Sequence, residues 1–134
     1  MTRVFVICVT LLGPLLIAAN PKLPVHLLAM HAHRYQDFQK KQVRCEVFGE
    51  IKNLGPQSIT QILMHVEFLD RNKKPVYQEQ MELALRVIKP GNAKGEQRPV
   101  QPQEIGNFIQ DTKECPENWQ EGRIKFEIKS FTTQ

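Results

Sequence analysis

Apolar and polar side chains alternate with a period of two along most of the chain after residue 41. Within residues 42–53, one parity is apolar or small and comprises Val43, Cys45, Val47, Gly49 and Ile51. The other parity is polar or charged apart from Phe48. The same period recurs in residues 59–69, 76–88 and 123–132. Such alternation is typical of half-buried antiparallel strands, so each of these segments is predicted to be a strand.

Clusters of turn-forming residues separate these segments. The runs NLGPQS at 53–58, DRNKKP at 70–75 and KPGN at 89–92 are rich in Gly, Pro, Asn, Asp and Ser. These residue types favour turns because of their backbone geometry and local hydrogen bonding. Short alternating strands with frequent turns are typical of a β-sandwich or barrel. The pattern therefore predicts an all-β domain and needs no helix after residue 41.

The sequence of residues 25–35 is compatible with either a strand or the start of a helix. Read as a strand, residues 25–35 place Leu27, Ala29, His31 and His33 on one face and His26, Leu28, Met30 and Ala32 on the other. Their Leu, Ala and Met content also suits the start of a helix. We expect a first strand here, with the helix as the alternative.

The region after residue 92 carries less periodicity. Residues 93–103 are polar and contain Pro99 and Pro102, so we expect a long connection with at most a short edge strand near Val100. Residues 105–109 predict another short strand, and residues 111–122 predict a loop. With the earlier segments, this gives an antiparallel β-sandwich of about seven strands.

The amino terminus predicts the compartment. Residues 4–19 form an apolar or neutral run that follows Arg3. As a helix this run would span about 24 Å, which is short for a bilayer core of about 30 Å. We therefore interpret residues 1–19 as a signal peptide cleaved after Ala19, with an uncleaved membrane-anchor helix as the alternative. Residues 20–134 would then be a single extracytoplasmic domain, either periplasmic or secreted.

Two cysteines remain after the leader, Cys45 and Cys115. In an oxidising compartment an even pair is readily explained as one disulfide. Two buried free thiols are the alternative. We expect the disulfide.

Several residues resemble a known family pattern. The resemblance is carried by the run Gly49-Glu50-Ile51-Lys52-Asn53-Leu54-Gly55, by Ser58-Ile59, by Val66-Glu67-Phe68-Leu69-Asp70 and by Pro75-Val76. This pattern resembles the FxLYD-type families, which are extracytoplasmic immunoglobulin-like β-sandwich domains. The Tyr of the namesake motif is absent, and Gln103 stands where the late motif has glycine. The resemblance implies an immunoglobulin-like fold in a secreted or membrane-anchored module without known catalysis.

Composition and motifs exclude several function classes. The formal net charge is only +4, and Lys and Arg are scattered, so nucleic-acid binding is not expected. The sequence has no G-x-S-x-G elbow, phosphate-binding loop, dinucleotide fingerprint or paired C-x-x-C zinc motif. We therefore expect neither an enzyme nor a cofactor. No polar constellation supports a small-molecule carrier.

The histidine-rich segment His26–His33 is the one candidate metal site. On a strand, His31 and His33 would point the same way, about 7 Å apart along the backbone. That spacing lets two imidazoles converge on copper or zinc if further ligands are supplied. The alternative reading is surface histidines on an edge strand.

Aromatic residues indicate the candidate interaction surface. Phe48 and Phe131 fall on outward parities, where exposed aromatics suggest docking against another protein. Trp119, in a loop, is either a binding anchor or a seal over one end of the sandwich, and we favour the seal. The resulting hypothesis is a non-enzymatic accessory or structural subunit of an envelope or membrane-associated assembly, tethered through residues 4–19 if the leader is not cleaved. The alternative is a periplasmic metal-binding or chaperone-like protein that uses the His26–His33 segment.

Overall fold

The computed structural model describes residues 23–89 and 91–134. The predicted leader, with its cleavage site and its alternative as an anchor helix, lies outside the described residues. Within them the chain forms eight strands and no helix, which confirms the all-β prediction. The strands are β1 (Val25–Asp37), β2 (Gln42–Asn53), β3 (Ile59–Leu69), β4 (Pro75–Ala84), β5 (Arg86–Lys89), β6 (Asn92–Gln97), β7 (Ile105–Asp111) and β8 (Ile124–Thr133).

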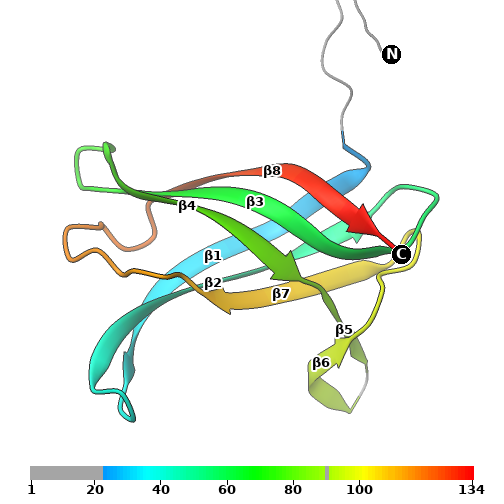
Figure 1. Cartoon of the computed structure of the whole chain (residues 1–134), viewed down its shortest axis with the longest axis horizontal. Coiled ribbons are helices and arrows are strands. Elements are labelled where there is room, and N and C mark those ends of the chain that lie inside the picture. The colour runs from blue at the N-terminus through cyan, green and yellow to red at the C-terminus, as the bar shows by residue number, and fades with distance from the viewer. Residues whose placement is uncertain (1–22, 90) are drawn as a thin grey trace, which may run out of the picture.

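The strands form two antiparallel sheets, an arrangement consistent with a β-sandwich (Figure 1). One sheet has five strands in the order β1-β2-β7-β5-β6, and the other has three in the order β4-β3-β8. Side chains from both sheets fill the core between them. The buried parity includes Val47 and Ile51 on β2, Met64 and Phe68 on β3, and Leu83 on β4. The alternation in the sequence therefore reports correctly which face of each of these strands is buried.

Strand β1 confirms the strand reading of the first segment, but its two faces differ from the simple alternation. A bulge in the pairing with β2 lies between Leu27 and Ala29. Because a bulge inserts one extra residue, the parity changes there. Leu27 therefore packs against the core together with Met30 and Ala32. His31 and His33 remain on the opposite, outward side.

The predicted single strand over residues 76–88 is wrong. The chain leaves the three-stranded sheet after β4 and joins the five-stranded sheet as β5, with Leu85 between them. Leu85 is fully buried, and its backbone N–H donates to the carbonyl of Thr60 at 3.1 Å. Apolar alternation continues across this crossover because both parts bury the same parity, so the sequence pattern does not mark it.

The predicted long connection over residues 93–103 is also wrong in its first half. Residues 92–97 form β6, which pairs with β5 in a hairpin whose turn contains Gly91 at a φ of 84°. Ile88, Lys89, Glu96 and Gln97 are all exposed. Val87 is the last buried residue of β5, and the described residues beyond it up to Gln97 are not buried, so the sequence there carries no alternation to find. Val100 forms an isolated bridge with Ile59, as expected.

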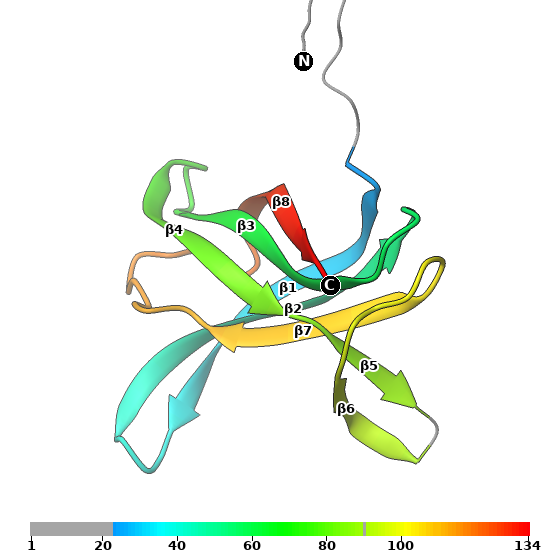
Figure 2. The same cartoon turned by 45° about the vertical axis from the view of Figure 1, so that its right-hand side comes forward.

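Two hairpins project from the same side of the molecule. The β1–β2 hairpin and the β5–β6 hairpin extend away from the sandwich on either side of β7 (Figures 1 and 2). We call the outer part of the first hairpin, residues 35–44, the β1–β2 arm.

Asn53 ties the turn after β2 to the strand segment before β7. Its side-chain amide donates to the carbonyls of Gln57 at 2.8 Å and Val100 at 2.9 Å, and its Oδ1 accepts from the Gly55 N–H at 2.9 Å. The residue is fully buried, and all of these polar atoms have partners. This Asn is therefore a structural residue of the turn.

Candidate interaction surface

The outer face of the five-stranded sheet is hollowed. A groove of about 660 Å³ lies there, lined by residues of β1, β2, β7 and β5. We call it the outer groove. Its size lies within the range of ligand pockets, about 300–1,000 Å³. Strand register sorts its exposed lining into two rows that cross the sheet.

The first row is apolar and aromatic. His31 pairs with Phe48 across β1 and β2, and Phe48 pairs with Ile109 across β2 and β7. Ile88 on β5 lines the same groove from beyond the second row, because the antiparallel pairing of Arg86 with Asn107 carries Ile88 away from Ile109. Ile109 is 56% exposed and Ile88 is 50% exposed. We call these four residues, three in register and Ile88 across the groove, the apolar row.

Phe48 lies at the centre of this row, flanked by two imidazoles. Its ring centroid is 5.3 Å from that of His31 and 5.3 Å from that of His33. The interplanar angles are 31° and 56°, so both contacts are tilted. Phe48 therefore occupies the outward parity that the sequence predicts, and the histidines bury part of it.

The second row is polar and has opposite charges at its ends. Glu50 pairs with Asn107, and Asn107 pairs with Arg86. The Asn107 amide donates to Glu50 Oε2 at 3.2 Å. Among the described side chains, which do not include those of residues 92–94, neither Glu50 nor Arg86 takes part in an ion pair. The groove thus offers one carboxylate and one guanidinium beside an apolar surface, neither of them in an ion pair with a described side chain.

Sequence reasoning finds Phe48 but misses Ile88 and Ile109. Both are isolated apolar residues on short strands, and a single exposed isoleucine is ordinary on a protein surface. The register of β2 and β7 places Ile109 beside Phe48, and the strand order of the sheet brings Ile88 into the same groove. That register depends on the strand order, which no local pattern in the sequence specifies.

The metal hypothesis for His31 and His33 stays a prediction. The two histidines share a face, as expected. His33 Nε2 lies 3.2 Å from Glu46 Oε1. Among the described residues, no group of three His, Cys, Asp or Glu side chains is arranged to hold a metal. Titration with copper and zinc, compared between the natural protein and a His31→Ala/His33→Ala variant, tests the hypothesis, and equal binding by both would reject it.

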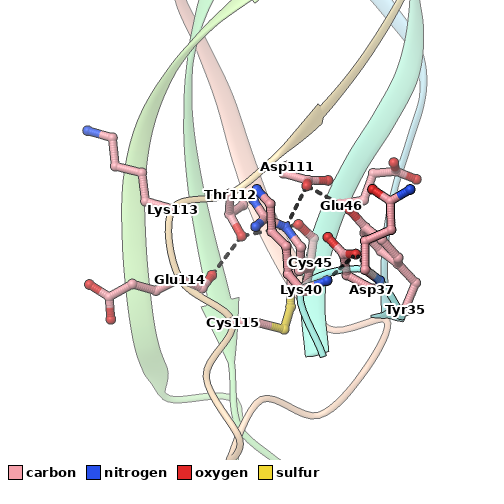
Figure 3. Close-up of polar contacts among 12 residues, drawn as sticks. Tyr35, Asp37, Lys40, Cys45, Glu46, Asp111, Thr112, Lys113, Glu114 and Cys115 are labelled. Carbon is pink, nitrogen blue, oxygen red and sulfur yellow. Dashed lines mark hydrogen bonds and ion pairs between the residues drawn. A yellow bond between two sulfur atoms is a disulfide. The ribbon is translucent and has the colours of Figure 1, made fainter. Parts of the chain in front are cut away.

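The disulfide between Cys45 and Cys115 is present, as predicted. It joins β2 to the loop after β7 at the base of the β1–β2 arm. Thr112 reinforces the junction, because its backbone N–H donates to the Cys45 carbonyl at 3.0 Å and its hydroxyl donates to the Glu114 carbonyl at 2.6 Å (Figure 3). The loop is therefore held at its start by covalent and hydrogen bonds.

A polar cluster beside the disulfide fixes the arm to β7. Asp111 Oδ2 accepts from the Tyr35 hydroxyl at 2.6 Å and from Arg44 Nε at 2.7 Å (Figure 3). The hydrogen bond to Asp111 raises the pKa of the Tyr35 hydroxyl, so that hydroxyl stays protonated. We interpret this cluster as a brace for the arm.

Trp119 seals the core, which agrees with the favoured reading. It is buried, and its ring stacks on Phe68 with centroids 4.6 Å apart. The Arg34 guanidinium lies 4.9 Å from the Trp119 ring centroid and donates to the carbonyls of Pro116 and Glu117. Trp119 therefore presents almost no surface to a partner.

Phe131, in contrast, does not point outward as the sequence predicts. The pairing of β3 with β8 is irregular between Leu63 and Met64, which pair with Ser130 and Ile128 and leave Lys129 as the extra residue. This bulge reverses the parity, so Phe131 pairs with buried Ile62 and packs against the core. Its predicted outward orientation is wrong.

Comparison with family models, with curated proteins and with solved structures gives no match to this chain. Within residues 23–89 and 91–134, no helix has the length and apolar character needed to cross a membrane.

Proposed function

We propose that this protein is a non-enzymatic extracytoplasmic interaction module, an accessory or structural subunit of an envelope or membrane-associated assembly. Its binding site is the outer groove, and its partner is a protein that places an apolar side chain on the apolar row. The observation that carries the proposal is the hollow of about 660 Å³ around Phe48, Ile88 and Ile109.

Physical chemistry supports a protein partner for this surface. Exposed apolar side chains gathered in one hollow, with polar groups at its rim, are typical of protein docking sites. Covering Ile88 and Ile109 would remove apolar area from water at roughly 25 cal/mol per Å². The charges of Glu50 and Arg86 would orient the partner, since charge complementarity contributes mainly to specificity.

The disulfide is compatible with an oxidising, extracytoplasmic location. An immunoglobulin-like arrangement fits the strand order. If β1, β2, β7 and β5 correspond to strands A, B, E and D, then β4, β3 and β8 correspond to C′, C and F. This correspondence supports an immunoglobulin-like sandwich and includes no strand G within the described residues, whereas the FxLYD proposal rests on the sequence resemblance alone.

Co-purification with a groove variant tests the proposed function. The natural protein, Ile109→Lys and the control Gln80→Lys are each captured from detergent-solubilised membranes. Ile109 lines the groove, whereas Gln80 is exposed on β4 of the other sheet. We expect a partner of defined mass with the natural protein and with Gln80→Lys, and loss of that partner with Ile109→Lys. A partner retained equally by Ile109→Lys would contradict the proposal.

A further inference from the structure

The tip of the β1–β2 arm exposes an aromatic side chain. Phe38 is 83% exposed, more than any other large apolar side chain that the structure describes. Its turn is fixed, because Asp37 Oδ1 accepts from the backbone N–H groups of Gln39 and Lys40 at 3.1 Å each. An ordered turn that holds a phenyl ring in water loses little conformational entropy when the ring is buried in a partner.

The tip also carries charges on both sides of Phe38. Asp37 precedes it, and Lys40 and Lys41 follow it. None of these three residues takes part in an ion pair with a side chain that the structure describes, which leaves out residues 1–22, 90 and 92–94. The tip therefore presents an apolar ring between an acidic group and basic groups.

The outer groove has the complementary arrangement. Its apolar row lies beside a polar row that ends in Glu50 and Arg86. Glu50 complements Lys40, and Arg86 complements Asp37. Each charged group of the tip therefore has a group of opposite sign in the groove. None of the four groups is in an ion pair with a described side chain.

The tip cannot reach the groove of its own molecule. Phe38 lies beyond the start of β2 at Gln42, and Phe48 is six residues further along that strand. At about 3.4 Å per residue, this separates the tip from the groove by roughly 20 Å along a paired strand. Any contact between them must therefore join two molecules.

We propose that the β1–β2 arm of one copy of this chain inserts Phe38 into the outer groove of a second copy. Lys40 then lies opposite Glu50, and Asp37 lies opposite Arg86. A reciprocal exchange of arms gives a closed two-fold dimer. The inference rests on the proposed function and names a second copy of this chain as the occupant of the outer groove.

The expected dimer is weak. Each contact centres on one aromatic side chain, so the interface falls below the size of stable complexes. We expect a micromolar dissociation constant, which sedimentation equilibrium of the purified protein measures directly. Phe38→Ser and Ile109→Lys should each weaken association by about tenfold or more, since each removes a central apolar contact.

Two matched controls separate the contact from a general loss of surface apolarity. Leu54→Ser removes an exposed apolar side chain from a turn elsewhere, and Ile105→Lys changes the same residue type on β7 outside the groove lining. Both should leave association unchanged. Because Phe38 is almost fully exposed, Phe38→Ser should also leave the unfolding transition unchanged.

A charge exchange tests the orientation. Lys40→Glu and Glu50→Lys should each weaken self-association about fivefold, because each places like charges opposite one another. When the two variants are mixed, both contacts of the mixed dimer regain opposite charges. We therefore expect the mixture to associate more tightly than either variant alone.

Three outcomes would overturn the inference. These are a monomer at every concentration, association that neither Phe38→Ser nor Ile109→Lys weakens, and a monomer that binds phosphatidylglycerol vesicles through Phe38. A monomeric protein that still captures a different partner through Ile109 would reject this inference and leave the proposed function standing.

Discussion

Asn53 shows how one buried polar residue can specify a connection. Its amide group bonds the Gln57 carbonyl and the Gly55 N–H in the turn after β2, and the Val100 carbonyl in the segment before β7. Buried amides without partners are costly, so a side chain with this geometry is stable only where all its partners are present. The turn after β2 and the bridge at Val100 are therefore fixed together.

Asn53→Ala is expected to lower the free energy of unfolding by about 2–4 kcal/mol, since it removes the partners of the Gly55 N–H and the Gln57 carbonyl and leaves the Val100 carbonyl with only the Ile59 N–H. Urea denaturation measures this change. The control is Asn107→Ala, which removes one hydrogen bond on the half-buried outer face and should cost about 1 kcal/mol or less. Equal midpoints for the two variants would contradict the structural role of Asn53.

Individual side chains were predictable wherever the strand kept strict alternation. The inward position of Cys45 and the outward position of Phe48 follow from the parity of residues 42–53, and both are confirmed. Trp119 was predictable as a seal from its size and its place near the disulfide. The inward orientation of Phe131 was not predictable, because one extra residue on β8 reverses the parity before it.

At the scale of elements, bulges and crossovers limit what the sequence can predict. The bulge after Leu27 and the bulge at Lys129 each shift the parity of an edge strand without any Gly or Pro to mark the position. At Leu85 the chain changes sheet, but the same parity is buried before and after it. Strand existence was therefore predictable, whereas sheet membership was not.

The outer groove is a product of sheet order. Its apolar row takes residues from four strands, and β7 enters the sheet between β2 and β5 only after an intervening excursion through the other sheet. Local patterns cannot bring Phe48, Ile109 and Ile88 together. The sequence could predict a partner surface near Phe48, and only the topology defines its extent.

At the scale of the whole molecule, the disulfide links the five-stranded sheet to the loop that leads into the three-stranded sheet. Cys45 is buried on β2, and Cys115 lies 70 residues later in the chain. In the chain-entropy model, closing a loop of this length stabilises the fold by about 4 kcal/mol. The Trp119 seal lies just beyond this link.

Reduction of the disulfide should lower the free energy of unfolding by about 4 kcal/mol. Urea denaturation with and without dithiothreitol measures the loss. A Cys45→Ala/Cys115→Ala variant is the control, since its midpoint should match the reduced protein and not respond to the reductant. An oxidised protein whose midpoint is unaffected by dithiothreitol would contradict the expected contribution.

The same covalent link determines how the protein would bear tension between its two ends. Force applied to the ends passes from Cys45 directly to Cys115, so the intervening chain, which includes β3 to β7, is shielded from the pull. At about 3.5 Å per residue, the shielded contour is roughly 240 Å. Within the described residues, only those before Cys45 and after Cys115 can be stretched, that is β1, the start of β2, the Trp119 loop and β8. The outer groove would therefore lose its β1 wall before any strand inside the loop unravelled.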